Sequence, residues 1–302
     1  MKVDVLVVGA GPAGATCAML AARMGFSVTL VDRMGIGGQL INIHSIKNYP
    51  GIADIAGWDL SAALTDQVME SGVNTELGTV ETLTNAGGTW TAQTDSDSIC
   101  ARAVVIATGG SPAPVPHGEK YEGRGISYCA TCDGPLYRGK PVAVIGGGDF
   151  AMSEVSFLAG VASDVYVLHP DRALTAAAAW QSEVKAKPNV KLLPSSELAE
   201  VTGENGVEGI TYVTLPDRTS QTLPVSAVFG ATGLVPNSSV VRDLVKTDDS
   251  GFIITDENLA TSQAGIFAVG DVRSGSAMLV ANAVGEGTRA ALSVAEYLNR
   301  GR

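Results

Sequence analysis

A glycine-rich hexapeptide, Gly9-Ala10-Gly11-Pro12-Ala13-Gly14, follows directly after a run of branched apolar residues at Val3–Val8. Such a continuous apolar run is typical of a strand buried on both faces of a parallel sheet. The Ala-rich stretch Ala15–Met24 predicts a helix, and Ser27–Val31 predicts a second strand. Strand, glycine turn, helix and strand in this order predict a dinucleotide-binding unit.

Each glycine of this motif has a separate task in such a unit. Gly9 permits the tight turn, Gly11 lets the backbone approach a pyrophosphate, and Gly14 lets helix and strand pack closely. The first turn of the helix supplies amide donors and partial positive charge to the phosphates. Asp32, at the end of the second strand, is placed to bind a ribose hydroxyl.

The same pattern returns in the second half of the chain. Val142–Ile145 predicts a strand, Gly146-Gly147-Gly148-Asp149-Phe150-Ala151 a second glycine turn, Met152–Ala159 a helix and Val165–Leu168 another strand. A length of 302 residues is enough for about two domains. We therefore expect an internal duplication of a nucleotide-binding unit.

A second repeated motif indicates that one unit is inserted in the other. Ala107-Thr108-Gly109 ends a predicted buried strand, and Ala231-Thr232-Gly233 repeats it much later. The proline-rich stretch Ser111–Pro116 lies between and is typical of a linker. The predicted fold class is α/β, with two three-layer Rossmann-like domains. The first would contain residues 1–113 and 241–302, and the inserted one residues 114–240.

Further elements are predicted around these motifs. Ala62–Glu70 and a segment from about 281 to 298 are typical of helices, and Val73–Leu83 and Thr89–Thr94 of strands. Gly265–Asp271 predicts a strand that brings Asp271 to its carboxyl end, where open α/β sheets bind ligands.

Cys129 and Cys132 are separated by two residues and can close a small disulfide ring. A zinc site would need four ligands, but Cys17 and Cys100 and the three histidines are scattered along the chain. The spacing therefore favours a redox pair that works by thiolate attack and mixed disulfides. Asp133 is either a proton donor and acceptor for the second thiol or a solvated turn residue.

The formal charge of −11 argues against nucleic acid or an anionic membrane as the main partner. Asp4 interrupts the apolar run near the N-terminus, and no stretch reaches the roughly 18 apolar residues of a membrane span. We predict a cytoplasmic protein.

Over essentially its whole length the chain resembles the low-molecular-weight thioredoxin reductases. The resemblance rests on the first glycine motif, Gly37-Gly38-Gln39-Leu40, Gly125–Tyr128 before Cys-Ala-Thr-Cys-Asp, and Phe267–Asp271. It implies that the outer domain binds FAD and that the inserted domain binds NADPH and carries the disulfide. It also implies a homodimer and a domain rotation, with hinges near Pro112–Pro116 and Pro236.

The resemblance also implies roles for individual residues. Cys132 would face the flavin, Cys129 would attack the protein substrate, and Asp133 would be the acid/base. The implied cofactor-binding residues are Gly9, Gly11, Pro12, Ala13, Gly14, Asp32, Arg33, Gly38, Gln39, Leu40, Asn48, Ala107, Thr108, Gly109, Gly270, Asp271, Leu279 and Val280 in the outer domain, and Gly146, Gly148, Asp149, Phe150 and Ala151 in the inserted domain.

Two departures from the family pattern concern the electron donor and the flavin. NADPH-dependent members carry His-Arg-Arg after the second motif, with another arginine four residues on, and these arginines bind the 2′-phosphate. This chain has His169-Pro170-Asp171-Arg172, with Thr175 in the last position. Near the flavin it has Met278-Leu279 where the family usually has Arg-Gln.

The sequence thus predicts a flavin-dependent dithiol/disulfide oxidoreductase with a thioredoxin-like protein disulfide as substrate. The missing arginines predict weak use of NADPH, with NADH, reduced ferredoxin or a second flavin nucleotide as donor. A dithiol oxidase that passes electrons through FAD to oxygen is one alternative. A non-catalytic flavin-binding redox sensor is another, although both cysteines and Asp133 are present.

Overall fold

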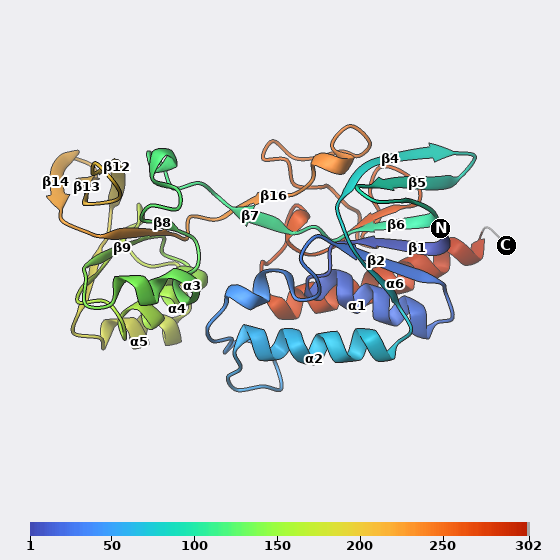
Figure 1. The fold of residues 1–302 in the computed structure, drawn as a ribbon, viewed down its shortest axis with the longest axis horizontal. Helices are drawn as coiled ribbons and strands as arrows, with labels where there is room; N and C mark the ends of the chain where they lie inside the picture. The colour runs from blue at the N-terminus through green and yellow to red at the C-terminus, as the bar shows by residue number, and fades with distance from the viewer. Residues whose placement is uncertain (301–302) are drawn as a thin grey trace. The chain divides into compact units, whose positions relative to one another are not determined.

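The computed structural model describes residues 1–300 and divides into two compact units. The first unit contains Met1–Ile41, Ile46–Ser111 and the chain from Val235 onward. The second contains Asn42–Ser45 and Pro112–Leu234. Figure 1 shows the elements of both units.

The first unit is built on a seven-stranded sheet in the order β3-β2-β1-β6-β5-β4, with β17 paired to β6. The β1, β2, β3, β6 and β17 strands pair in parallel, and β4 and β5 are antiparallel. Their bounds are β1 (Lys2–Val8), β2 (Val28–Asp32), β3 (Asn74–Leu77), β4 (Val80–Ala86), β5 (Thr89–Thr94), β6 (Ser98–Ile106) and β17 (Ile266–Ala268).

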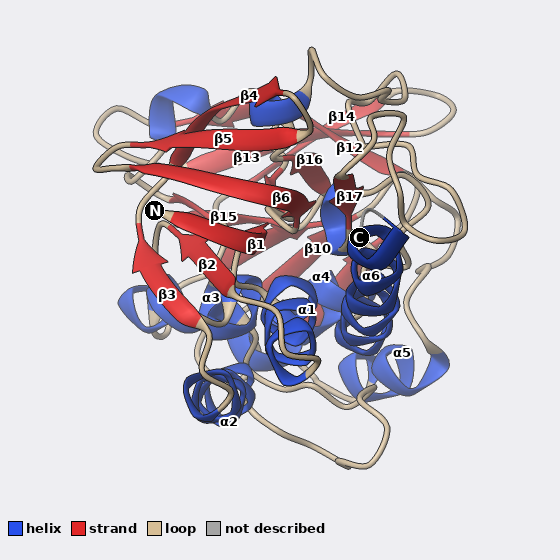
Figure 2. Ribbon diagram, turned by 90° about the vertical axis from the view of Figure 1, so that its right-hand side faces the viewer, coloured by secondary structure: helices blue, strands red, loops and turns tan. Residues whose placement is uncertain are grey.

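Both faces of this sheet are covered. Successive side chains of a strand point to opposite faces, so a continuous apolar strand needs packing partners on both. Val5 and Val7 of β1 pack with the helices α1 (Pro12–Arg23) and α6 (Val280–Arg300). Leu6 and Val8 pack on the opposite side with apolar residues from Val241–Ile253. The third long helix, α2 (Gly57–Glu70), lies on the same side as α1. Figure 2 shows α1, α2 and α6 on the same side of the sheet.

The second unit has a five-stranded parallel sheet in the order β11-β10-β9-β15-β8. Helices α4 (Asp149–Leu158) and α5 (Ala178–Lys185) pack on one face. A three-stranded antiparallel sheet of β12 (Ser196–Thr202), β13 (Gly209–Thr214) and β14 (Thr219–Leu223) packs on the other. The parallel strands are β8 (Ile126–Ser127), β9 (Val142–Ile145), β10 (Val165–Leu168), β11 (Val190–Leu193) and β15 (Ala227–Gly230).

The predicted α/β class with two three-layer units is confirmed. Some element bounds differ from the predictions. The expected single strand over 73–83 is two strands, because the chain turns at Gly78, whose amide donates to Asp32 O, and β3 and β4 then pair with different neighbours. The helix expected from Ala62 begins at Gly57, since Gly57, Ser61 and Val68 form its buried face.

The proline-rich linker is also more ordered than its composition indicated. Gly110–Pro112 forms β7, which pairs with β16 (Leu234–Pro236), so the two chain crossings form a two-stranded sheet. The structure groups residues 235–240 with the first unit, although the sequence placed them in the inserted domain. The reason is Asn237, which bonds to Thr108, Gly109 and Ser111.

None of the helices in the part of the chain that the structure describes is long and apolar enough to cross a membrane.

Candidate active site

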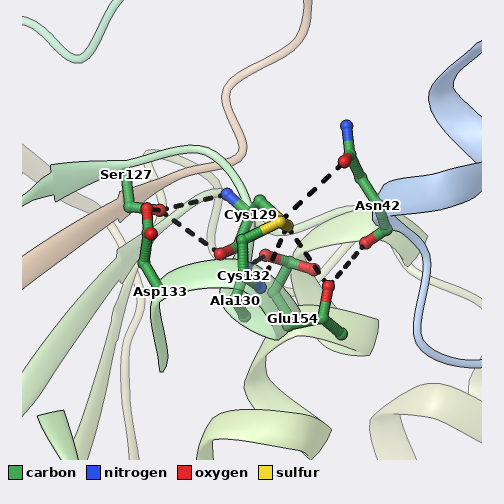
Figure 3. The surroundings of a disulfide bond; sticks show 8 residues. Asn42, Ser127, Cys129, Ala130, Cys132, Asp133 and Glu154 are labelled. Atoms are coloured by element: carbon green, nitrogen blue, oxygen red, sulfur yellow. Dashed lines mark hydrogen bonds between the residues drawn. A yellow bond between two sulfur atoms is a disulfide. The ribbon is translucent and has the colours of Figure 1, made fainter. Parts of the chain in front are cut away.

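The two cysteines of the predicted redox pair are joined in a disulfide. The distance between their sulfur atoms is 2.10 Å, and their Cα atoms are 5.4 Å apart. Cys129 precedes the short helix α3 (Ala130–Asp133), and Cys132 lies within it; α3 follows β8 and continues into a 3-10 helix, η3 (Gly134–Tyr137). Cys129 is half-buried and Cys132 is exposed. We call residues 127–133 the redox turn (Figure 3).

Local hydrogen bonds explain why this stretch turns. Cys129 has an extended backbone, and its sulfur accepts the amide of Cys132 at 3.2 Å. The amide of Asp133 donates to Cys129 O at 3.1 Å. Ser127 Oγ accepts the Cys129 amide at 3.2 Å and lies 2.7 Å from Asp133 Oδ2, to which it donates. Asp133 is therefore held by Ser127 and is not a freely solvated turn residue; its acid/base role stays a prediction.

The structure adds Glu154, which the sequence analysis did not single out. This residue lies on α4 and is buried, and its Oε2 accepts the amide of Ala130 between the two cysteines at 2.5 Å. Burial raises the pKa of Glu154 to about 7, against an ordinary value of 4.5, and the Ala130 hydrogen bond opposes this rise. An acid among the apolar residues that follow the first turn of the helix after the second glycine motif was the available signal.

The raised pKa of Glu154 has a defined effect on stability. Between pH 4.5 and about 7 the folded protein keeps a proton that the unfolded chain has lost. The contribution of Glu154 to stability is therefore greatest at low pH and falls as the pH rises through this window.

The first glycine motif has the geometry of a nucleotide cradle. A Cβ atom at Gly9, where φ is +102°, would lie 2.3 Å from Ala107 O, and one at Gly14 would lie 1.9 Å from Gly9 O. A Cβ at Gly11 would meet no atom within 4 Å. Gly9 and Gly14 are thus required by packing inside the protein, whereas Gly11 borders open space. This is the arrangement that a pyrophosphate above the start of α1 needs.

Asp32 lies where β2 ends and is oriented by three backbone amides. Its Oδ2 accepts the amide of Ala10 at 2.7 Å, and its Oδ1 accepts those of Met34 at 2.8 Å and Gly35 at 3.1 Å. The carboxylate borders a pocket of about 190 Å³ that extends to Thr65 and Met69 of α2. A carboxylate held in this way can accept a further hydrogen bond from a ribose hydroxyl.

Other predicted residues of the first unit gather at the same edge of the sheet. A Cβ at Gly38 would lie 2.9 Å from Gly11 Cα, and one at Gly270 would lie 3.0 Å from Ala13 Cβ. Gln39 donates to Gly110 O at 3.0 Å, and Thr108 Oγ1 donates to Asn237 O at 2.6 Å. Leu40 is buried, whereas Arg33, Asn48 and Leu279 are exposed.

Asp271 lies in a 3-10 turn, η5 (Gly270–Val272), directly after β17. Burial raises its pKa, and its Oδ1 accepts a hydrogen bond from Ser276 Oγ at 3.1 Å, which opposes the rise. The turn is held by Glu286 of α6, whose Oε2 accepts the amide of Gly270 at 2.7 Å and whose Oε1 pairs with Arg273. The sequence analysis did not identify this buried pair.

Glu286→Ala is expected to destabilise the fold by about 3–5 kcal/mol, because it leaves the Arg273 charge without its buried partner. The measurement is urea unfolding. Glu296→Ala on the same helix is the matched control, since it breaks only the exposed pair with Arg300, worth about 0.3–0.5 kcal/mol. Equal losses in the two variants would show that the Glu286–Arg273 pair does not support the turn.

The second glycine motif has the same backbone form. Gly146 has φ +146°, and a Cβ there would lie 2.3 Å from Ala231 O. The following loop is tied to this turn, because the amides of Thr175 and Ala176 both donate to Gly147 O at 3.0 Å. The atom closest to a Cβ at Gly148 would be Thr175 Oγ1, at 3.9 Å. The side chain of Thr175 therefore faces the turn.

The remaining predicted residues of the second unit lie at the start of α4. Asp149 begins the helix, and its Oδ1 accepts the amide of Ala177 at 2.7 Å. Phe150 is exposed and Ala151 is buried. Asp171 and Arg172 are both exposed, so the loop presents one acidic and one basic side chain.

Comparison with known proteins agrees with this geometry. The family model described as pyridine nucleotide-disulphide oxidoreductase matches residues 3–287. The thioredoxin reductase of Listeria monocytogenes is 34% identical over 298 residues, which cover 98% of this chain and 93% of the relative. The Lactococcus lactis thioredoxin reductase structure, in a conformation named FR, superposes with a TM-score of 0.96 at 33% identity, covering 99% of this chain and 100% of that one. The T. acidophilum thioredoxin reductase gives 0.95 at 31% identity, covering 100% and 99%.

Proposed function

The chain belongs to the pyridine nucleotide-disulphide oxidoreductase family as a thioredoxin reductase-like flavoenzyme, and from this premise we propose that it reduces a thioredoxin-like protein disulfide through Cys129 and Cys132. The observation that carries the proposal is the closed disulfide on a half-exposed turn. Family membership implies FAD and a pyridine nucleotide as cofactors.

The two cysteines exchange a disulfide with the substrate in balanced steps. The Cys129 thiolate attacks one sulfur of the substrate disulfide, forms a mixed disulfide and releases the other substrate sulfur as a thiolate. Cys132 then attacks Cys129, which restores the internal disulfide and releases the second substrate thiol. In this proposal the carboxylate of Asp133, which accepts a hydrogen bond from Ser127 Oγ, takes up the proton that leaves Cys132.

The cradle around Gly11 fits a dinucleotide such as FAD, with Asp32 at its ribose and Asp271 at the ribityl and phosphate part. FAD would supply two-electron transfer to the disulfide. The second cradle around Gly148 fits a nucleotide pyrophosphate, but arginine is absent from positions 171 and 175. We propose that NADPH is a poor donor here and that NADH, reduced ferredoxin or a second flavin nucleotide supplies the electrons.

A turnover assay with artificially reduced holoenzyme tests the proposed function. The enzyme is reduced anaerobically with dithionite, freed of excess reductant and mixed with an oxidised thioredoxin-like protein. We expect new protein thiols in proportion to the enzyme added. Oxygen consumption driven by a protein dithiol, without disulfide reduction, would instead identify a dithiol oxidase. No exchange in either direction would identify a flavin-binding sensor.

FAD binding is tested by Gly11→Ala, which should leave the fold intact. Gly11 has φ −65° and ψ 178°, which alanine adopts freely, and its Cβ would contact no protein atom. The added methyl group would occupy the approach of the pyrophosphate, at about 1–3 kcal/mol, or a roughly 5- to 150-fold weaker Kd. The measurement is FAD titration of the apoprotein, with its melting temperature as the check of folding.

Gly285→Ala is the matched control for this prediction. Gly285 is an exposed residue of α6 whose Cβ would also contact nothing within 4 Å, so FAD affinity should not change. Equal FAD affinity in both variants would mean that the cofactor does not lie over Gly11. Assembly as a homodimer and a cytoplasmic location stay predictions of the sequence.

A further inference from the structure

Glu154 contacts the redox turn on its buried side through a hydrogen bond. It projects from the middle of α4, and its Oε2 accepts the amide of Ala130, the residue directly after Cys129, at 2.5 Å. Figure 3 shows its carboxyl group on the α4 side of the turn, next to the cysteines. Ala130 is completely buried and Glu154 is 2% exposed. The carboxyl group therefore acts on the turn without reaching solvent.

The second oxygen of this carboxyl group is in an unusual environment. Glu154 Oε1 is buried and has no hydrogen-bond partner among residues 1–300. An ionised carboxylate is costly to bury when one of its oxygens is unpaired. This cost agrees with a pKa raised to about 7 by burial, so the group changes charge near neutral pH.

No charged side chain among the described residues pairs with Glu154. The strand β9 carries no titratable side chain. The titratable side chains on neighbouring segments have partners other than Glu154. They are Asp133 with Ser127 (α3), Tyr137, whose ring packs on Phe229 (η3), Asp149 with the Ala177 amide (α4), Glu183 with Ser156 and Lys185 with Gln181 (α5), Tyr166 with Lys191 (β10), and His44, whose ring packs on Phe157. The charge of Glu154 is therefore balanced mainly by the Ala130 amide.

The sulfur of Cys129 accepts a hydrogen bond from the amide of Cys132 at 3.2 Å. Thr131 Oγ1 also lies 3.2 Å from this sulfur, although the hydroxyl donates to Asn42 O at 3.3 Å. Near Cys132 Sγ there is instead an oxygen, Asn42 Oδ1, at 4.0 Å. After reduction, Cys129 is thus the sulfur that the Cys132 amide would stabilise as a thiolate. A carboxylate bonded to the adjacent amide would oppose that negative charge.

We propose that Glu154 is a positioning residue that orients the Ala130 amide and controls, through its own charge, how readily Cys129 ionises after the disulfide is reduced. The proposal rests on the proposed disulfide chemistry. Reduction consumes two electrons and two protons and produces two thiols, and loss of one proton from Cys129 produces the attacking thiolate. Neutral Glu154 permits this loss, and ionised Glu154 hinders it.

The test compares the acidity of Cys129 in the wild-type holoenzyme and in Glu154→Gln. The glutamine keeps an oxygen for the Ala130 amide but cannot ionise. The disulfide is reduced with a phosphine, which takes up the oxygen of water as two thiols form, and the excess is removed anaerobically. Alkylation by iodoacetamide is then followed against pH, with peptide mass spectrometry to separate Cys129 from Cys132 and Cys100.

We expect the two proteins to coincide well below pH 7, where Glu154 is neutral, and to diverge above it. The apparent pKa of Cys129 should be lower in Glu154→Gln by roughly 1–2 units, the effect of removing a nearby like charge. Glu183→Gln is the matched control, since Glu183 bonds to α4 through Ser156, away from the turn, and should leave the profile unchanged.

Superimposable wild-type and Glu154→Gln profiles above pH 7 would overturn the proposal, as would an equal shift in Glu183→Gln. Glu154→Asp provides a second test in case glutamine disturbs the turn. Aspartate restores a carboxylate at this position, so the pKa of Cys129 should be higher in Glu154→Asp than in Glu154→Gln. This titration needs no protein substrate or electron donor. Failure of the proposed function would appear separately, as absent turnover in the wild type.

Discussion

Cys132→Ser is expected to abolish turnover of disulfide substrates while the bound flavin stays reducible by dithionite. Cys132 forms the disulfide with Cys129, and a serine hydroxyl can neither complete that bond nor resolve a mixed disulfide at neutral pH. The loss should be at least about 10⁴-fold, within the range found when a nucleophile is removed. The measurement is anaerobic turnover of an oxidised thioredoxin-like protein.

The mutant should also accumulate a covalent complex with its substrate. Cys129 remains able to attack, but the mixed disulfide cannot be resolved from within the turn, so it should be visible by non-reducing electrophoresis. Cys100→Ser is the control, because Cys100 is a free, partly buried cysteine of the first unit and should be silent. Normal turnover by Cys132→Ser would refute the assignment of the redox pair.

NADPH is expected to reduce the flavin poorly. Each hydrogen bond between an arginine and a phosphate is worth roughly 1.5–3 kcal/mol, so loss of two or three should weaken NADPH by at least about a hundredfold. Asp171 adds repulsion toward a 2′-phosphate and suits a bare ribose hydroxyl. Arg172 is the exposed basic side chain nearest to Asp171 in the sequence. It lies two residues after Pro170, whose fixed φ alters the exit from β10, so we do not expect Arg172 to replace the missing arginines.

The structure allows the prediction to be tested by restoring the arginines. The loop 171–177 is fixed on the second glycine turn, and the side chain at 175 faces Gly148. The double variant Asp171→Arg, Thr175→Arg should therefore gain NADPH affinity by at least about tenfold, with NADH affinity nearly unchanged. Anaerobic titration with flavin bleaching as the signal measures both.

Glu204→Arg controls for charge in general. Glu204 is an exposed residue in the loop between β12 and β13 of the same unit, so the change adds a similar charge away from the glycine turn. We expect no gain in NADPH use from it. Rapid, stoichiometric bleaching of the unmodified protein by micromolar NADPH would show that the missing arginines do not decide the donor.

Features that depend on neighbouring residues could be predicted from the sequence. Branched apolar runs such as Val142–Ile145 are strands with the same bounds in the structure, because burial on both faces requires an unbroken apolar pattern. The turns at Gly9 and Gly146 could be predicted because positive φ is favourable only for glycine. The spacing of Cys129 and Cys132 permits a disulfide wherever the chain turns between them, as it does here with Cα atoms 5.4 Å apart.

Features that depend on distant residues needed the tertiary structure. The sequence contains no local sign that Glu154 accepts the Ala130 amide, that Asn237 binds Thr108 and Ser111, or that Glu286 holds Gly270. Each pairing exists because packing leaves a buried polar group that must find a partner, and which partner it meets depends on how whole helices and strands are placed. Periodicity and turn chemistry specify the elements, whereas long-range packing specifies the environment of each charge and so the acidity of the groups beside the disulfide.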